Sequence, residues 1–289
     1  MRNQRNQLGI FATVFKRPEF ESVLNAVKKQ GLHKIEFNLS CTDVLDMANT
    51  DTLPAEAYID HSIIDNIRTV TKNNHVEMVS IAGYFNMIHP DVKLRSKGLQ
   101  QLDVLMRAAH ELDISLVALC TGTRDMNHLW RKHKDNSQPE AYIDILESMA
   151  AALVMADKYD ITVAFEPEIN LVIDSPQKTR EFLDDLKSPR LKVIFDSANI
   201  FPEGGFEKMD KIMTGAIELL AEDIVLVHAK DVTTENQAGD CCAGKGRLDY
   251  GLYMRLLREI NYEGAILLHS LSEAEVDGCI KHVTGHMSG

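Results

Sequence analysis

The chain has 289 residues, of which 45% are hydrophobic and 26% charged, a composition typical of a folded globular protein and not of a disordered chain. Its 31 Lys and Arg against 43 Asp and Glu give a net charge of −12, which disfavours nucleic acid as a partner because phosphate binding depends on Lys and Arg. We expect no membrane partner and no signal peptide, since no stretch approaches the roughly 20 apolar residues of a membrane span. Five cysteines without C-x-x-C spacing favour reduced thiols and a cytoplasmic protein.

Eight short apolar segments are predicted to be strands, and the segments between them show helical periodicity. In chain order the expected strands are Leu8–Thr13, Lys34–Phe37, Val76–Ile81, Leu116–Cys120, Thr162–Glu166, Lys192–Asp196, Ile224–Ala229 and Ala265–His269. Most of these are continuously apolar, as expected for parallel strands that are buried on both faces.

The intervening segments carry recognisable helix signals. Pro18 and Gly31 bracket one expected helix, Pro139–Tyr159 is another, and Ser175 is a predicted N-cap before Pro176. Eight alternating units without a break in composition predict a (β/α)8 TIM barrel as a single domain over residues 1–289. An open doubly wound sheet is the alternative, but no G-x-G-x-x-G or P-loop pattern follows any expected strand.

Ionisable or amide side chains follow the apolar part of four consecutive expected strands. They are Glu166 and Glu168 on the fifth, Asp196 and Asn199 on the sixth, His228 and Lys230 on the seventh, and His269 on the eighth. In a TIM barrel the C-terminal strand ends carry the catalytic groups. Such groups are costly to bury unless they share a cation, and mixed oxygen and nitrogen ligands suit Mn²⁺, Zn²⁺, Co²⁺ or Fe²⁺ better than Ca²⁺. The pattern therefore predicts a divalent metal site, the alternative being that each residue simply ends a strand or starts a turn.

The alternation of side chains along a strand adds a second layer to this site. Glu166 and Glu168 share a face if the strand continues, and His228 and Lys230 do so for the same reason. We therefore expect Glu168 and Lys230 to lie above the metal, where a substrate would bind. A surface salt bridge is the alternative for Lys230.

Several of these runs resemble a known family, the sugar phosphate isomerase/epimerase superfamily of xylose isomerase-like TIM barrels, also called AP endonuclease family 2. The runs that carry the resemblance are Phe165–Glu168, Phe195–Asn199 and Val227–Asp231. The later run Gly244–Tyr250 is similar to the glycine-rich loop that precedes the last strand in this family.

The resemblance implies a set of metal ligands. In the family a Glu, an Asp, a His and a Glu from strands five to eight bind a divalent metal, and by position these are Glu166, Asp196, His228 and His269. His269 departs from the pattern because Glu is usual there. An imidazole can bind a metal, but it cannot replace the carboxylate that serves the epimerases as second acid/base, which puts two-base epimerisation in doubt.

Two further runs, Gly83–Asp91 and Cys120–Asp125, resemble a less-studied branch of the superfamily. The expected substrate contacts are Asn86, His89, Arg124, His133, Glu168 and Asn199. Arg124 is the candidate for binding a carboxylate or phosphate with its two-pronged guanidinium, and the alternative is a structural pair with Asp125 or a contact that holds the loop. Trp130 either covers the site or anchors its loop.

The resemblance implies a divalent-metal-dependent isomerase or epimerase that acts on a sugar, ketose, polyol or sugar acid, phosphorylated or not, through a metal-stabilised enediolate. Glu166 is then the expected base, and Lys230 or His269 returns the proton. A dehydratase or lyase of an inosose-like keto-polyol and a non-catalytic sugar-binding relative remain alternatives. A DNA-repair endonuclease is disfavoured, since Asn199 stands where such an enzyme needs a His ligand. The expected partner is a small carbohydrate, and a homodimer is left open.

Overall fold

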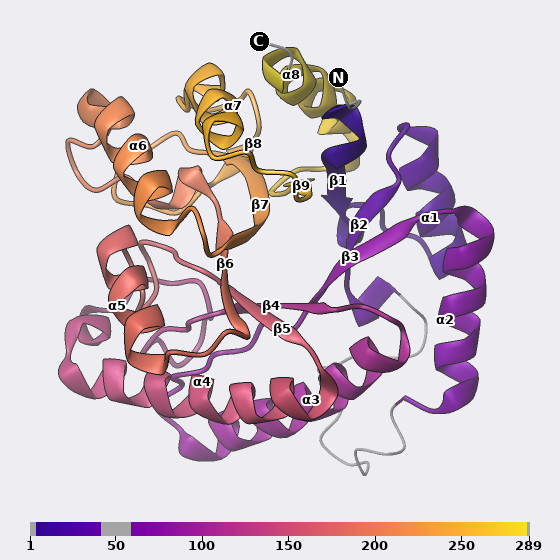
Figure 1. The fold of residues 1–289 in the computed structure, drawn as a ribbon, viewed down its shortest axis with the longest axis horizontal. Helices are drawn as coiled ribbons and strands as arrows, with labels where there is room; N and C mark the ends of the chain where they lie inside the picture. Colours follow the sequence, from indigo (N-terminus) through magenta and orange to yellow (C-terminus); the bar gives the residue numbers. More distant parts are fainter. Residues whose placement is uncertain (1–3, 42–58, 288–289) are drawn as a thin grey trace.

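Within the described residues, 4–41 and 59–287 of a computed structural model, eight parallel strands close into a barrel (Figure 1). The strands are β1 Leu8–Phe11, β2 Lys34–Phe37, β3 Glu77–Ala82, β4 Leu116–Cys120, β5 Thr162–Glu166, β6 Leu191–Phe195, β7 Ile224–Asp231 and β9 Ile266–Leu268. Each pairs with the next in this order, and β9 pairs back to β1, which closes the ring. The predicted (β/α)8 TIM barrel is confirmed, and the open doubly wound sheet is excluded.

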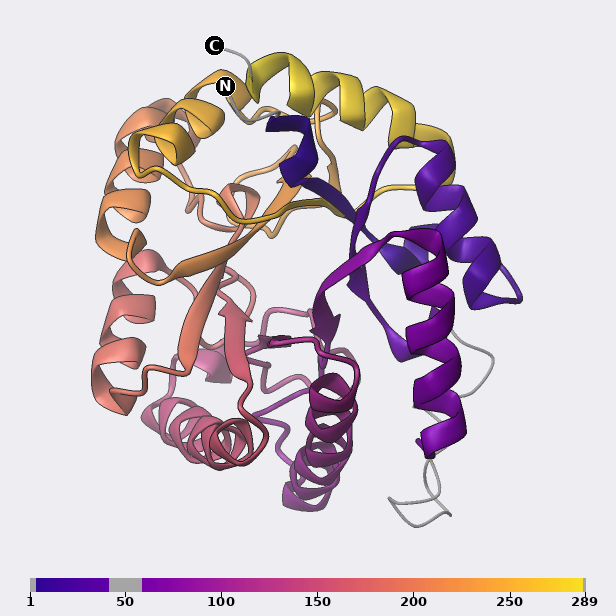
Figure 2. The same cartoon turned by 45° about the vertical axis from the view of Figure 1, so that its right-hand side comes forward.

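A helix follows each barrel strand, and the helices surround the barrel (Figures 1 and 2). They are α1 Phe20–Lys29, α2 His61–Asn74, α3 Val92–Glu111, α4 Pro139–Tyr159, α5 Pro176–Leu186, α6 Met209–Leu220, α7 Tyr250–Glu259 and α8 Val276–Met287. The predicted N-cap of α5 is confirmed, because Ser175 Oγ accepts a hydrogen bond from the Lys178 N–H. Gly31 ends the α1 segment with a φ of 73°, a conformation that favours glycine. In the part of the chain that the structure describes, no helix is both long and apolar enough to cross a bilayer.

The eight predicted strands are all present, and their ends differ by a few residues. β1 ends at Phe11 and not at the predicted Thr13, and β7 continues past the predicted end at Ala229 to Asp231. There it pairs antiparallel with a two-residue strand, β8 Cys241–Cys242, in which Cys242 lies opposite Lys230. The extra pairing keeps the backbone extended through Lys230 and so carries this side chain to the mouth of the barrel.

A small apolar cluster fills the interior of the barrel below its C-terminal mouth. Its buried members are Leu116, Ala118, Ala164, Ile194, Leu226, Ala265 and Leu267. Two residues further along β5, β6 and β7 come Glu166, Asp196 and His228, which share the inward face with that cluster because side chains alternate along a strand. The apolar layer therefore forms the floor of a polar layer.

Candidate functional site

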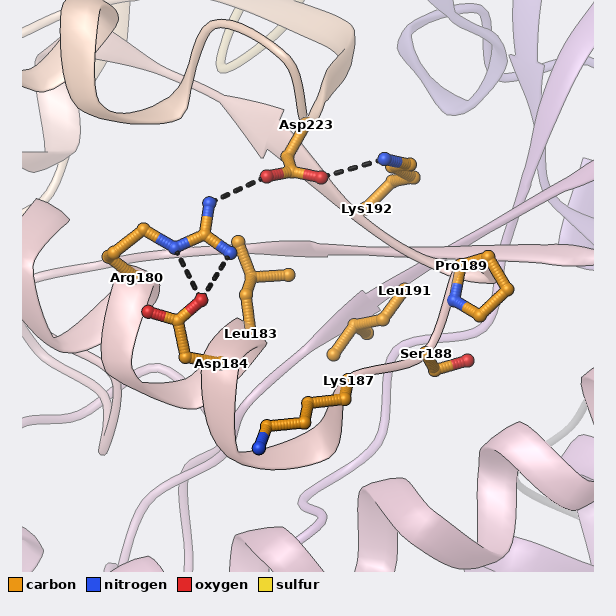
Figure 3. Close-up of a pocket in the computed structure, with 9 residues that line it drawn as sticks. All are labelled: Arg180, Leu183, Asp184, Lys187, Ser188, Pro189, Leu191, Lys192 and Asp223. Carbon is orange, nitrogen blue, oxygen red and sulfur yellow. Dashed lines mark hydrogen bonds and ion pairs between the residues drawn. The ribbon is translucent and has the colours of Figure 1, made fainter.

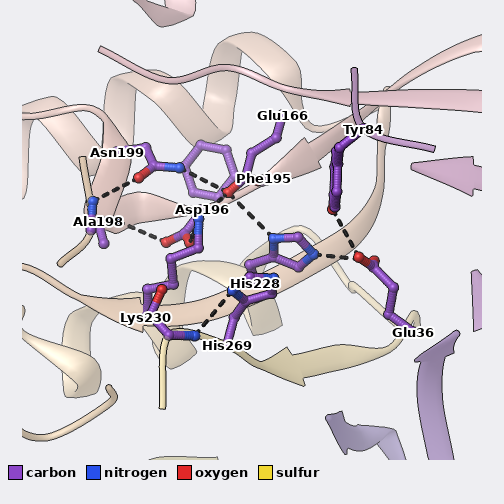
Figure 4. Close-up of polar contacts among 12 residues, drawn as sticks. Glu36, Tyr84, Glu166, Phe195, Asp196, Ala198, Asn199, His228, Lys230 and His269 are labelled. Atoms are coloured by element: carbon purple, nitrogen blue, oxygen red, sulfur yellow. Dashed lines mark hydrogen bonds and ion pairs between the residues drawn. The ribbon is translucent and has the colours of Figure 1, made fainter. Parts of the chain in front are cut away.

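Three side chains of the kinds that bind metals lie close together on the floor of the barrel mouth (Figure 4). Glu166 ends β5, Asp196 directly follows β6, and His228 lies within β7. Each offers one ligand atom, and these atoms all lie within 4.8 Å of one another. All three side chains are buried. The sequence prediction that these residues meet is confirmed.

Lys230 and Asn199 hold the carboxylates of this triad in place. Lys230 Nζ lies 2.7 Å from Glu166 Oε1 and 3.3 Å from Asp196 Oδ2, and the Lys230 residue is only 5% exposed. Lys230 is therefore part of the buried site and not of a surface salt bridge. Asn199 Nδ2 donates to Glu166 Oε1 at 2.8 Å, while its Oδ1 accepts from the Gly239 N–H at 2.8 Å. Asn199, expected to contact substrate, thus uses both ends of its amide within the protein.

Neighbouring charges and burial act against each other on the ionisable groups. Burial raises the pKa of Glu166, but Lys230 and His228 outweigh it and hold this pKa well below its usual range. Burial lowers the pKa of His228, yet the carboxylates of Glu166 and Glu36 raise it to about 10. At Glu168 burial dominates and raises the pKa to about 8. In the absence of a metal, Glu166 is thus an anion at neutral pH, while Glu168 is mainly a neutral acid.

The donor set fits a divalent cation. Among the described residues, Asp196 Oδ2 and both ring nitrogens of His228 are buried without a well-directed hydrogen bond. Two carboxylates and an imidazole suit the same metals that the sequence favoured, Mn²⁺, Zn²⁺, Co²⁺ or Fe²⁺. The Lys230 ammonium neutralises part of the same carboxylate charge, so it and a metal ion compete for Glu166 and Asp196.

His269, the expected fourth ligand, lies beside the triad without belonging to it. Its ring stacks between Phe11 and His228, with ring centroids 4.7 and 4.9 Å away. Its Nδ1 accepts from the Ser270 N–H at 3.0 Å, and its buried Nε2 has no hydrogen-bond partner among the residues described. Burial, His228 and Lys230 together lower the pKa of His269 well below its usual range, so its ring is neutral. Ligation by His269 stays a prediction.

Glu36, which the sequence patterns did not single out, lies on the far side of His228. It is fully buried within β2, and its Oε2 lies 3.5 Å from His228 Nε2. Ser80 and Tyr84 both donate hydrogen bonds to its carboxylate. A signal was available, because an acidic residue between Ile35 and Phe37 in a strand buried on both faces needs a partner.

A pocket of about 620 Å³, called the mouth pocket below, opens above the triad. The residues that line it are Phe11, Tyr84, Leu129, Trp130, Glu166, Glu168, Asn170, Lys230, Gln237, Ala238, Gly239, Asp240, His269 and Ser270. Trp130 packs edge-on against Tyr84 with centroids 5.5 Å apart, so aromatic rings form one part of the wall. Glu168 is 4% exposed, and within the described chain its Oε1 has no hydrogen-bond partner. The pocket thus combines aromatic surface with unsatisfied polar groups, as sites for polar small molecules do.

Besides Asn199, four expected substrate contacts do not line this mouth pocket in the described structure. Arg124 Nη1 lies 2.6 Å from Asp144 Oδ2 and donates to the Ile88 carbonyl, so the guanidinium is used within the fold. Arg124 thus forms a structural pair of the kind given as the alternative, although the partner is Asp144 and not Asp125, and a role in substrate binding stays a prediction.

The other three residues also serve the loops that carry them. Asn86 binds the backbone of Thr123, His89 Nδ1 accepts from the Asp91 N–H, and His133 Nδ1 accepts from the Asp135 N–H. His133 and Arg124 line a separate pocket of about 640 Å³ at the rim. The geometry gives these residues structural contacts and does not bring them to the triad.

A further pocket lies at the opposite end of the barrel, where β6 begins (Figure 3). Arg180, Lys187 and Lys192 are the cations that line it, and Arg180 and Lys192 both pair with Asp223 at 2.7 Å. Arg180 also pairs with Asp184. Two of the three cations that line this pocket are therefore already paired with carboxylates.

Comparisons with known proteins agree with this architecture. The model of the xylose isomerase-like TIM barrel family matches residues 24–278. No curated protein sequence matches the chain. A D-tagatose 3-epimerase-like protein superposes with a TM-score of 0.72 at 16% identity, covering 97% of this chain and 98% of that one.

Two other solved structures have similar scores. The 3-keto-D-glucoside 4-epimerase YcjR from E. coli has a TM-score of 0.71 at 13% identity, with 96% of this chain and 99% of that chain covered. The probable 3-DHS dehydratase AsbF from Bacillus anthracis has a TM-score of 0.71 at 14% identity, with 96% and 98% covered. At such low identities these likenesses show the fold alone.

Proposed function

This chain belongs to the family of xylose isomerase-like TIM barrels, and from that premise we propose that it is a divalent-metal-dependent isomerase or epimerase of a sugar, ketose, polyol or sugar acid. One observation carries the proposal. The ligand atoms of Glu166, Asp196 and His228 lie within 4.8 Å of one another beneath a pocket lined by polar and aromatic side chains. Two solved structures of the same fold are named as a D-tagatose 3-epimerase-like protein and a 3-keto-D-glucoside 4-epimerase, which supports a substrate of this class.

The proposed mechanism assigns a role to each group at the base of the pocket. Glu166, Asp196 and His228 would hold the cation, with His269 as a candidate fourth ligand. When bound, the cation supplies Lewis acidity to a substrate carbonyl and the hydroxyl beside it. Glu166, an anion that lines the pocket, takes the proton from the carbon next to that carbonyl, and the electron pair moves to the carbonyl oxygen.

The remaining side chains position the substrate and complete the proton transfer. Lys230 is protonated before the reaction, because the carboxylates around it outweigh burial and raise its pKa above the usual value, and it donates a hydrogen bond to the oxygen that gains charge. Lys230 then gives a proton to the neighbouring carbon in an isomerase or to the opposite face in an epimerase, and the proton that Glu166 took replaces the one that Lys230 lost. His269, whose ring is neutral, can return the proton instead only after it receives the proton from Glu166. Glu168 binds a substrate hydroxyl through its Oε1, which has no hydrogen-bond partner among the described residues.

Metal analysis joined to solvent exchange tests this proposal. The purified protein is dialysed against Mn²⁺, Zn²⁺, Co²⁺ or Fe²⁺, its metal content is measured, and it is incubated with ketoses, 3-keto sugars and sugar acids in D₂O. We expect about one metal ion per chain and deuterium at the carbon beside the carbonyl, seen by NMR. Glu166→Gln should abolish the exchange. A wild-type protein without metal and without exchange would contradict the proposal and favour a sugar-binding relative.

A dehydratase or lyase of a keto-polyol is a second candidate. The observation that favours it is His269, because elimination needs one carboxylate base whereas two-base epimerisation needs two. AsbF, one of the similar structures, is named as a probable dehydratase. The same NMR experiment separates the candidates, since elimination produces an unsaturated product and epimerisation produces a stereoisomer.

A further inference from the structure

Glu36 is a buried carboxylate inside the barrel that the proposed mechanism does not use. We infer that it is a positioning residue, which holds the imidazole of His228 by its Nε2–H so that Nδ1 faces the cation. The inference rests on the proposed function, because it concerns the same metal centre.

The environment of Glu36 fixes where its carboxylate points. Glu36 lies opposite Ser80 in the register of β2 and β3, and Ser80 Oγ donates to its Oε2 at 3.0 Å. The Tyr84 hydroxyl donates to its Oε1 at 2.8 Å. Each oxygen thus has a donor supplied by the adjoining strand or the residues just after it. Hydrogen bonds of this kind stabilise the ionised form of a carboxylate and limit its rotation.

The ring of His228 is held between two carboxylates. Its Nε2 lies 3.5 Å from Glu36 Oε2, and its Nδ1 lies 3.3 Å from Glu166 Oε1 (Figure 4). One face of the ring stacks on His269. Both carboxylates act only as acceptors toward the ring. When a cation takes the place of the proton at Nδ1, the remaining proton of a neutral His228 therefore lies on Nε2, where it faces Glu36.

This arrangement is what a metal-binding histidine requires from its surroundings. A carboxylate that accepts the second N–H of such a histidine fixes its tautomer and its orientation, and loss of the carboxylate typically weakens metal binding by about 10- to 100-fold. A carboxylate that only stabilised the fold would affect the melting temperature without a specific effect on metal affinity. The two roles are therefore separable by experiment.

The first test is Zn²⁺ affinity, measured by competition calorimetry on metal-free protein. We expect Glu36→Gln to weaken Zn²⁺ binding by about 10- to 100-fold. Ser80→Ala, which removes one donor to Glu36 and leaves the mouth pocket intact, should weaken it by about fivefold. The matched control is Glu77→Gln, the same substitution at an exposed barrel residue that pairs with Lys34, and it should bind Zn²⁺ like the wild type. If Glu36→Gln does not fold, Ser80→Ala decides.

The second test is spectroscopic. In Zn²⁺-loaded protein with ¹⁵N-labelled histidine, the His228 signals, assigned by their loss in His228→Gln, should show a metal-bound Nδ1 and a protonated Nε2. The Nε2–H signal should shift and exchange faster with solvent in Glu36→Gln. If the variants keep the wild-type Zn²⁺ affinity and an unchanged His228 signal, the positioning role of Glu36 is overturned and the proposed function is not. A wild-type protein that binds no divalent metal would overturn the proposed function as well.

Discussion

Each end of the barrel carries a cluster of ionised groups, and the two clusters differ in burial and in charge balance. At the N-terminal end, Asp223 lies between the cations of Arg180 and Lys192, and all three side chains reach solvent. At the C-terminal end, the buried carboxylates of Glu166 and Asp196 share the ammonium of Lys230.

The difference teaches how to separate structure from function in such clusters. A carboxylate matched by cations and accessible to water is a modest contribution to stability. Buried carboxylates are costly when they outnumber the cations nearby. A protein therefore retains such carboxylates mainly where they bind a ligand or take part in a reaction. Changing one member of each cluster should therefore have very different effects.

The largest effect is expected from Asp196→Asn in the buried cluster. Loss of one of two carboxylate ligands should weaken divalent-metal binding by more than about 100-fold and abolish metal-dependent exchange. Metal content after dialysis is the measurement. Asp223→Asn, the corresponding change at the other end, should keep the wild-type metal content. Equal metal loss in Asp196→Asn and Asp223→Asn would contradict the view that only the buried cluster binds the metal.

Lys230→Met should have the next largest effect, and in the opposite direction for metal affinity. Removing the competing ammonium should tighten Zn²⁺ binding by about tenfold while turnover is lost. Without metal, the unpaired carboxylates should destabilise the protein by about 3–5 kcal/mol. Thermal melts in EDTA and in Zn²⁺ measure both, and Lys192→Met is the control. Unchanged Zn²⁺ affinity in Lys230→Met would show that the Lys230 ammonium does not compete with the metal for Glu166 and Asp196.

A pH-dependent effect is expected from Asp223. Burial raises its pKa, but hydrogen bonds from Lys192 and Arg180 outweigh burial and lower it. Its stabilising contribution is therefore complete above the unfolded-state pKa and disappears as the pH falls through the lower folded-state pKa. Asp223→Asn should lower the melting temperature by about 2 °C at pH 7 and by less at pH 2. A pH-independent difference between variant and wild type would contradict this account.

The smallest effect on catalysis is expected from Arg124→Gln. Because Arg124 pairs with Asp144 outside the mouth pocket, the variant should change KM for any substrate found by less than about twofold. Glu168→Gln, inside the pocket, should raise KM more and provides the matched comparison. Steady-state kinetics measure both. A large increase in KM for Arg124→Gln but not for Glu168→Gln would indicate that Arg124 contacts the substrate.

The site was predictable where its residues obey local rules. Glu166, Asp196 and His228 each follow an apolar run on the inward face of a strand, and parallel strands bring such ends together. Glu36 obeys the same inward-facing rule, but Phe37 follows it within the strand, so the pattern of polar residues after apolar strands does not indicate it.

By itself, the sequence determined the (β/α)8 fold and the triad, because both follow from the periodicity of apolar residues within short segments. Only the tertiary structure decided that Glu36 meets His228 and that Asp144 binds Arg124. Glu36 and His228 lie far apart in the chain, and Arg124 and Asp144 belong to a loop and to the helix that follows it. A charged side chain has many potential partners of opposite charge, and the packing of strands and helices determines which one lies within reach.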